Sequence, residues 1–172
     1  MIKGINKVVV SYYNGDVRTV VRLGTTGTAA FEISGETCHS ALKLPVNRPY
    51  HKLSGNRLRE LQTRFSHFRV IIIDEVSMMG QKMICYIDRR LREISGKGNE
   101  PFGGYWVILV GDFQQLPPVG DKALYDVDGS DSFLLFDSIS DVVELKTTER
   151  QSGNDTEQQH FKRCYPIAKK VY

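Results

Sequence analysis

Acidic and amide side chains follow two apolar stretches of this chain, and their types suit a site for a metal ion and a nucleotide. Residues 70–75 read Val-Ile-Ile-Ile-Asp-Glu, and residues 107–112 read Val-Ile-Leu-Val-Gly-Asp, with Gln114 and Gln115 close behind. Carboxylate oxygens are ligands that Mg²⁺ prefers, and a second carboxylate can orient or deprotonate an attacking water. A glutamine held rigidly nearby can sense a terminal phosphate. The pattern therefore indicates chemistry on a nucleotide phosphate.

A parallel sheet is the element that would bring these side chains together. Short β-branched runs are typical of strands buried on both faces of such a sheet, and strands are predicted at 69–73 and 105–110. Further strands are predicted at 17–23 and 142–145. Ligands of open α/β sheets bind at the carboxyl ends of the strands, which is where the acids stand.

Helical patterns alternate with these strands. Helices are predicted at 2–14, 28–31, 37–42, 57–65, 83–94 and 155–164. The segment at 2–14 also fits a strand that turns at Asn14-Gly15, but its apolar spacing favours a helix. The helix at 83–94 has the clearest apolar stripe, and Gly96 is its expected C-terminal stop. The alternation predicts an α/β fold with a mostly parallel sheet flanked by helices.

Composition sets broad limits on the class of protein. A chain of 172 residues with 41% apolar and 25% charged residues is typical of one globular domain with a proper core. The net charge of +3 permits contact with nucleic acid without indicating it. Cys38, Cys85 and Cys164 have no metal-binding spacing, so we expect free thiols and no zinc. Neither a signal peptide nor a membrane span is predicted.

Each motif also has an ordinary structural interpretation. An isolated apolar run that ends in Asp-Glu more often supplies a turn cap and a solvated glutamate than a catalytic pair. Here a second acid-ended strand exists, and the eight residues from Gly111 to Pro118 combine a tight turn with two prolines that fix the exit path. Together these features favour the catalytic interpretation.

Four segments resemble the Pif (petite integration frequency) family of superfamily 1B DNA helicases. They are IIIDEVSMM, GDFQQLPPV, TTGTAAFEISGETCHSAL upstream of both, and ERQSGND downstream. The resemblance covers residues 1–160 and leaves 161–172 as a divergent tail. It implies a partial RecA-like P-loop NTPase domain, the first of two motor domains. Such a motor hydrolyses ATP with Mg²⁺, moves 5′ to 3′ along single-stranded DNA and unwinds duplexes at forks.

The resemblance also implies cellular roles and residue roles. The family acts in DNA repair, recombination and telomere maintenance, and we expect an intracellular location, nuclear or mitochondrial in a eukaryote. Asp74 would serve Mg²⁺ and Glu75 would be the catalytic base. Gln115 would sense the γ-phosphate and link hydrolysis to DNA contact, and Arg150 would contact the γ-phosphate in the transition state.

Two upstream segments would contact the DNA backbone without reading its sequence. The residues implied are Gly27, Thr28 and Ala29 in the first segment, and Thr37, His39 and Ser40 in the second. Taken alone, His39 is more often a structural histidine. Phe113 is expected to pack in the core rather than stack on a base.

The sequence departs from the family pattern at its phosphate loop. No GxxxxGK[S/T] occurs in the 172 residues, and the family's loop would precede the helix at 2–14. Gly24-Thr25 replace the usual Ala-Pro, and Pro166 interrupts an expected helix. We therefore expect an exposed sheet edge, and a polypeptide that binds ATP poorly and unwinds nothing alone. The alternative is a short, non-catalytic protein that binds nucleic acid or a protein partner.

Overall fold

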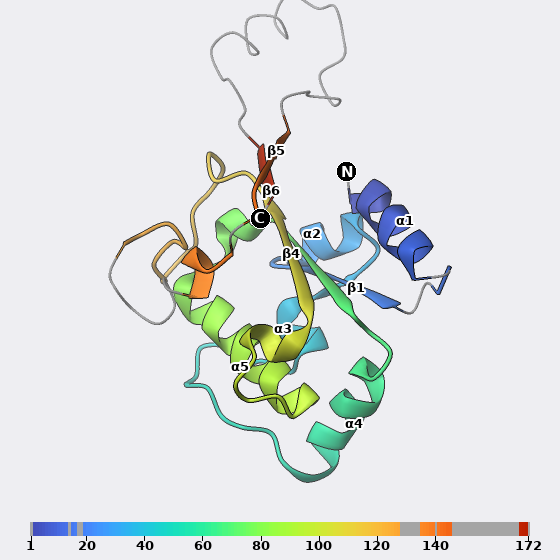
Figure 1. Cartoon of the computed structure of the whole chain (residues 1–172). Coiled ribbons are helices and arrows are strands. Elements are labelled where there is room, and N and C mark those ends of the chain that lie inside the picture. Colours follow the sequence, from blue (N-terminus) through green and yellow to red (C-terminus); the bar gives the residue numbers. More distant parts are fainter. Residues whose placement is uncertain are drawn as a thin grey trace, which may run out of the picture.

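Parallel strands form the centre of the fold. The computed structural model describes residues 2–13, 15–16, 19–127, 135–139, 141–145 and 169–171. Four parallel strands lie side by side in the order β2 (Glu36–Thr37), β1 (Val20–Gly24), β3 (Val70–Asp74) and β4 (Trp106–Gly111). The prediction of a mostly parallel α/β sheet is thus confirmed (Figure 1).

Two antiparallel strands extend the sheet beyond β4. β6 (Lys169–Val171) pairs with β4, and β5 (Val143–Leu145) pairs with β6. The strand predicted at 142–145 is therefore present, although it runs antiparallel to its neighbour. β6 was not predicted, because a three-residue strand that begins with two lysines carries no recognisable alternation.

The helices follow the predicted order. They are α1 (Ile2–Tyr12), α2 (Gly27–Glu32), α3 (Cys38–Ala41), α4 (Gly55–Phe65) and α5 (Gln81–Ser95), with short 3₁₀ turns η2 (Val76–Met78) and η3 (Pro101–Gly104). The helical interpretation of the first segment is confirmed. The helix predicted at 155–164, which includes Cys164, lies outside the described residues.

Side chains of β3 alternate between two hydrophobic cores, one on each face of the sheet. Ile71 and Ile73 pack with α3, α4 and α5, whereas Val70 and Ile72 pack with α1. These four side chains are 0–4% exposed. Burial on both faces explains why the strand is an unbroken apolar run, and it gives the layered arrangement seen in Figure 1.

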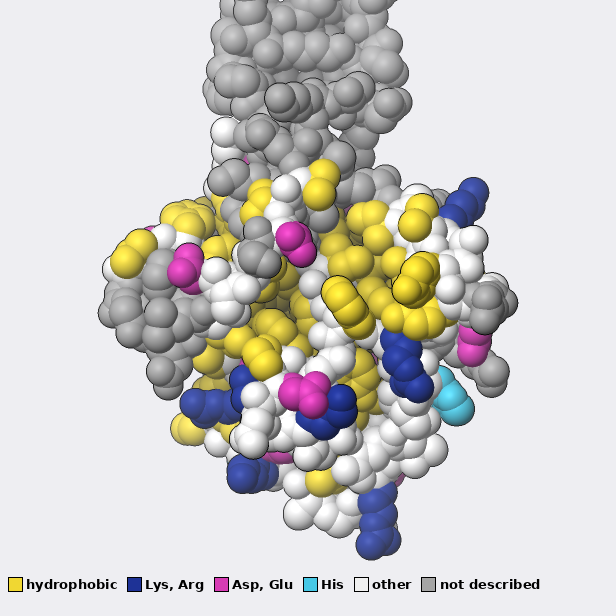
Figure 2. Space-filling view, viewed as in Figure 1, with side chains coloured by type: hydrophobic (Ala, Val, Ile, Leu, Met, Phe, Trp, Pro, Cys, Tyr) yellow, Lys and Arg dark blue, Asp and Glu magenta, His cyan; other side chains and the backbone are white. Residues whose placement is uncertain are grey.

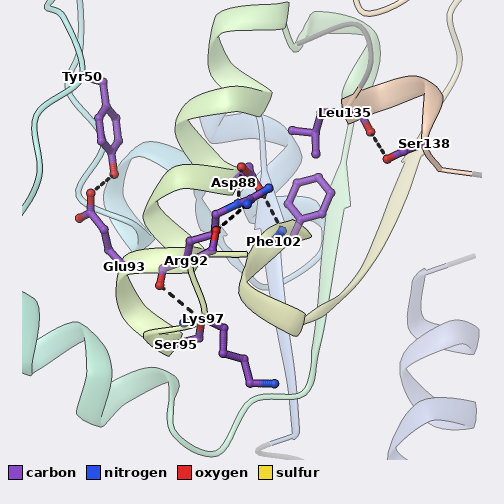
Figure 3. A network of polar contacts seen from close by, with 10 residues as sticks. Tyr50, Asp88, Arg92, Glu93, Ser95, Lys97, Phe102, Leu135 and Ser138 are labelled. Atoms are coloured by element: carbon purple, nitrogen blue, oxygen red, sulfur yellow. Dashed lines mark hydrogen bonds and ion pairs between the residues drawn. The ribbon is translucent and has the colours of Figure 1, made fainter. Parts of the chain in front are cut away.

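α5 is anchored at its C-terminal end to η3. The Asp88 carboxylate accepts hydrogen bonds from the backbone N–H of Phe102, at 2.6 Å, and from Arg92 Nε, at 2.8 and 2.9 Å (Figure 3). Gly96 ends the helix with a φ of 73°, a conformation that glycine adopts without strain, as predicted. This junction fixes the start of β4, which begins two residues after η3.

The outer edge of β4 is partly unpaired. β4 contacts β6 only through Val110 and Gly111. From Trp106 to Leu109, the outer edge pairs with no strand among the described residues, and Trp106 is 72% exposed. This agrees with the expected exposed edge. In the part of the chain that the structure describes, no helix has the length and apolarity needed to cross a bilayer.

Candidate functional site

Three of the predicted site segments meet at the carboxyl-terminal edge of the parallel sheet. In the strand register, Gly24 at the end of β1 lies opposite Asp74 on one side and Thr37 on the other. Neighbouring strands are about 4.8 Å apart, so this row spans about 10 Å from Thr37 to Asp74. Asp74 and Glu75, called the acid pair below, therefore share one edge of the sheet with both predicted DNA-contact segments.

Glu75 has an unusual backbone conformation at this edge. Its φ of 59° and ψ of 44° are left-handed, which costs about 1–2 kcal/mol for a residue with a Cβ. Two donors hold its carbonyl oxygen, the backbone N–H of Met78 at 3.2 Å and the Thr25 hydroxyl at 2.9 Å. The Thr25 N–H also donates to the Asp74 carbonyl at 3.3 Å. Such strain is typical of functional sites, where the surrounding structure enforces it.

Asp112 organises the turn that carries Gln115. The Asp112 side chain is buried, with Oδ1 accepting from the Gln114 N–H at 3.0 Å and Oδ2 accepting from Gln115 Nε2 at 3.4 Å. The Gln115 N–H donates to the Asp112 carbonyl at 3.0 Å. The predicted phosphate sensor is thus held at the end of β4. The sequence interpretation noticed Asp112 as an acid but gave it no role, although its propensity for such turns was a usable signal.

The ends of β3 and β4 lie in close contact. A Cβ on Gly111 would come within 2.8 Å of the Val76 backbone nitrogen, so only glycine allows this approach. Ser77, in the same 3₁₀ turn, is 2% exposed, and its hydroxyl has no hydrogen-bond partner among the described residues. The sequence interpretation counted Ser77 as part of the motif but gave it no role of its own. A buried hydroxyl without a partner, two residues after Glu75, fits a site that holds a further polar group.

The donor set at this edge fits Mg²⁺ bound together with a nucleotide. Nowhere in the described ranges do three or more His, Cys, Asp or Glu side chains gather as a metal site. Mg²⁺ usually binds through one or two carboxylates, with phosphates and waters completing its shell. Asp74, half-buried at this edge, provides one such carboxylate.

The first predicted DNA-contact segment lies at the start of α2. Thr26 caps this helix by accepting a hydrogen bond from the Ala29 N–H at 3.1 Å. Gly27 and Thr28 are exposed, whereas Ala29 is buried and its N–H is already bonded. A Cβ at Gly24 would overlap the backbone of α2, so the helix is pressed against the end of β1.

The second predicted segment lies at the start of α3. The Thr37 hydroxyl accepts from the Ser40 N–H at 3.2 Å and caps the helix. Ser40 is exposed, and Thr37 and His39 are half-buried. Burial lowers the pKa of His39 below its usual 6.5, so the imidazole is neutral at pH 7. It would contact a phosphate as a neutral donor and not as a cation.

Two further predicted residues have different outcomes. Phe113 packs against Tyr125 and Phe136 with ring centroids 5.5 and 6.0 Å apart, which confirms the expected packing role. Arg150 lies outside the described residues, so its role stays a prediction.

Basic side chains gather elsewhere on the molecule. On the face drawn in Figure 2, most Lys and Arg side chains lie over the lower half of the molecule. A shallow hollow on α4 is lined by Asn56, Arg59, Glu60, Thr63 and Arg64. None of the residues predicted to contact DNA is Lys or Arg, and the exposed ones, Gly27, Thr28 and Ser40, offer hydroxyls and backbone groups.

Comparison with known proteins identifies relatives of the chain. The family model described as PIF1-like helicase matches residues 4–171. The "ATP-dependent DNA helicase PIF1" of Candida albicans is 33% identical over 144 residues, which are 76% of this chain and 16% of that protein. The chain thus spans about a sixth of the length of this curated relative.

Solved structures agree with the sequence comparison. The crystal structure of Bacteroides sp Pif1 in complex with ADP-AlF4 matches with a TM-score of 0.55 and 31% identity, over 68% of this chain and 27% of that one. The structure of Bacteroides Pif1 bound to ssDNA matches with a TM-score of 0.51 and 28% identity, over 79% of this chain and 30% of that one.

Proposed function

Because this chain belongs to the PIF1-like helicase family, we propose that it forms part of the first motor domain of an ATP-dependent DNA helicase. The observation that carries the proposal is the row of Thr37, Gly24 and Asp74 across three strands. It brings the acid pair and the DNA-contact segments to one sheet edge, so that nucleotide chemistry can respond to DNA. The ADP-AlF4 and ssDNA complexes of Bacteroides relatives support the same pairing of ligands.

At the nucleotide, each residue has a distinct task. Asp74 would hold Mg²⁺, which would neutralise charge on the phosphates. Glu75 orients and deprotonates the attacking water, and its left-handed backbone sets the direction of its carboxylate. Gln115, held by Asp112, contacts the terminal phosphate. Arg150 stabilises the charge that develops in the transition state.

At the DNA, the exposed starts of α2 and α3 contact phosphates through Gly27, Thr28, Thr37, His39 and Ser40. Backbone N–H groups and hydroxyls position a strand without reading its bases. Because few counterions are released when neutral donors replace Lys and Arg, this contact alone would depend only weakly on salt. A full-length helicase that contains this domain would move 5′ to 3′ along single-stranded DNA and unwind forks. It would act in DNA repair, recombination and telomere maintenance, in the nucleus or mitochondrion.

The 172-residue polypeptide itself is proposed to lack helicase activity. It contains no GxxxxGK[S/T], and the lysine and backbone of that loop normally hold the β- and γ-phosphates. A second candidate function is binding of nucleic acid without catalysis. Both candidates predict DNA binding at this edge, and neither predicts ATP turnover by these 172 residues alone.

Binding and turnover measured on the same protein test these proposals. Fluorescence anisotropy with a labelled oligothymidylate should show binding that Thr28→Glu weakens several-fold, because the new carboxylate faces the DNA phosphates. Thr63→Glu is the matched control, since it adds the same charge at an exposed position in the basic hollow of α4. If Thr63→Glu weakens binding and Thr28→Glu does not, DNA binds at α4 and the proposed edge is wrong.

Phosphate release with single-stranded DNA and Mg-ATP then tests catalysis. We expect no turnover above the Glu75→Gln variant. Turnover that Glu75→Gln abolishes would show that the polypeptide is an active ATPase without its phosphate-loop lysine.

A further inference from the structure

Thr25 links the predicted DNA-contact segment to the acid pair directly. It stands two residues before Gly27, immediately after β1. Its side-chain hydroxyl donates to the Glu75 carbonyl at 2.9 Å, and its N–H donates to the Asp74 carbonyl at 3.3 Å. The side chain therefore reaches across from β1 to the residue that the proposed function makes the catalytic base.

Contacts between the residues before and after the turn that contains Thr25 hold the turn together, so its two ends move as one unit. Thr26 accepts a hydrogen bond from the Ala29 N–H, and Gly24 lies against the backbone of Ala30 with no room for a Cβ. Gly27 and Thr28 form the exposed tip of this turn. A phosphate that pulls or pushes the tip displaces Thr25 with it.

Glu75 is held in a conformation that depends on the hydrogen bonds to its carbonyl. Left-handed backbone is unfavourable for glutamate, and the Met78 N–H and the Thr25 hydroxyl both donate to this carbonyl. The Met78 bond also closes the first turn of η2. Loss of the Thr25 bond would let Glu75 relax toward ordinary backbone angles, and its carboxylate would change direction.

We propose that Thr25 is a positioning residue that transmits occupancy of the DNA-contact tip, Gly27 and Thr28, to the backbone of Glu75. This proposal rests on the proposed function, because it takes single-stranded DNA as the ligand of the tip. In this arrangement, bound DNA tightens the bond between Thr25 and Glu75 and stabilises the orientation of the catalytic carboxylate. DNA binding would thereby affect ATP hydrolysis through Thr25 at the end of β1, in addition to its effect through Gln115.

Amide hydrogen exchange followed by NMR tests the link without requiring ATP turnover. The Met78 N–H is hydrogen-bonded to the Glu75 carbonyl, so its exchange rate reports on the Glu75 conformation. The internal reference is the N–H of Ile84 in α5, which is hydrogen-bonded to the Gly80 carbonyl. In free protein, Thr25→Val should speed Met78 exchange about five-fold relative to Ile84, the factor for one ordinary hydrogen bond. Thr25→Ser keeps the hydroxyl and should leave the Met78 rate unchanged.

The same measurement with an oligothymidylate tests transmission. Bound DNA should slow Met78 exchange at least about two-fold in the wild type, in Thr25→Ser and in Ser66→Ala, and should have no effect in Thr25→Val. Ser66→Ala removes a comparable hydrogen bond, from the Ser66 hydroxyl to the Thr63 carbonyl at 2.8 Å, outside the proposed site, and is the matched control. Circular dichroism establishes that each variant is folded, and Thr25→Ala replaces Thr25→Val if the latter does not fold.

Fluorescence anisotropy with the same oligothymidylate distinguishes failure of the Thr25 proposal from failure of the proposed function. If DNA binds and Met78 in Thr25→Val responds as in the wild type, the positioning role is wrong while the proposed function stands. If the wild type binds no DNA, the proposed function fails and this inference fails with it.

Discussion

Removing the Glu93 carboxylate should destabilise the protein strongly, because it leaves a buried arginine without its counter-charge. Arg90 is fully buried in α5, and its Nη1 donates to Glu93 Oε2 at 2.5 Å. The same carboxylate accepts from the Tyr50 hydroxyl at 2.6 Å (Figure 3) and from the Leu53 N–H at 3.2 Å. Glu93 thus fastens the loop between α3 and α4 to α5.

The expected magnitude follows from this burial. Breaking a buried ion pair by deleting one partner costs about 3–5 kcal/mol, a large part of the total stability of a domain. The cost falls at the upper end of that range, because Arg90 Nε already has no hydrogen-bond partner within the described part of the chain. The double variant Arg90→Met/Glu93→Ala should lose less than Glu93→Ala alone, since it leaves no unpaired charge.

Urea unfolding followed by circular dichroism measures both variants. The matched control is Glu100→Ala, which deletes an exposed carboxylate paired with Lys97 and should cost no more than about 1 kcal/mol. A loss below about 1 kcal/mol for Glu93→Ala would refute the reasoning. So would a double variant that loses as much stability as Glu93→Ala alone.

Two further predictions concern the packing of β1 and the thiols. Gly24→Ala should lower the melting temperature by several degrees, because the added Cβ would overlap the backbone of α2. Gly27→Ala is the control and should change the melting temperature little, because the space around Gly27 is open. Equal shifts in melting temperature for the two variants would contradict this packing. Burial raises the pKa of Cys38 to about 12, so the thiolate is absent at neutral pH, and Cys38 should resist iodoacetamide while the half-buried Cys85 reacts. Mass spectrometry showing equal alkylation would contradict this.

The strands and helices with strong periodicity could be predicted from sequence. β3 is an unbroken apolar run because both of its faces are buried. α5 shows an apolar stripe because only one of its faces is buried. The direction of β5 was not predictable, because its pairing partner β6 is far along the chain and carries no strand pattern. Short elements whose pairing is decided by distant contacts leave no local signal.

The residue types of the site were visible in the sequence, but their positioning was not. Asp74 and Glu75 stand where an apolar run ends, yet nothing in Asp-Glu-Val predicts a left-handed Glu75 whose carbonyl accepts a hydrogen bond from Thr25, immediately after β1. Arg90 likewise looks like a surface charge within a helix. Its burial depends on Tyr50 and Glu93, which only the folded chain brings together.

The central claim is that DNA binds at the sheet edge that also carries the acid pair, and amide chemical shifts test it most directly. Titrating the ¹⁵N-labelled protein with an oligothymidylate should shift the amides of Gly27, Thr28 and Ser40 most, with smaller shifts at Glu75. Shifts concentrated in α4, or none at saturating DNA, would contradict the account.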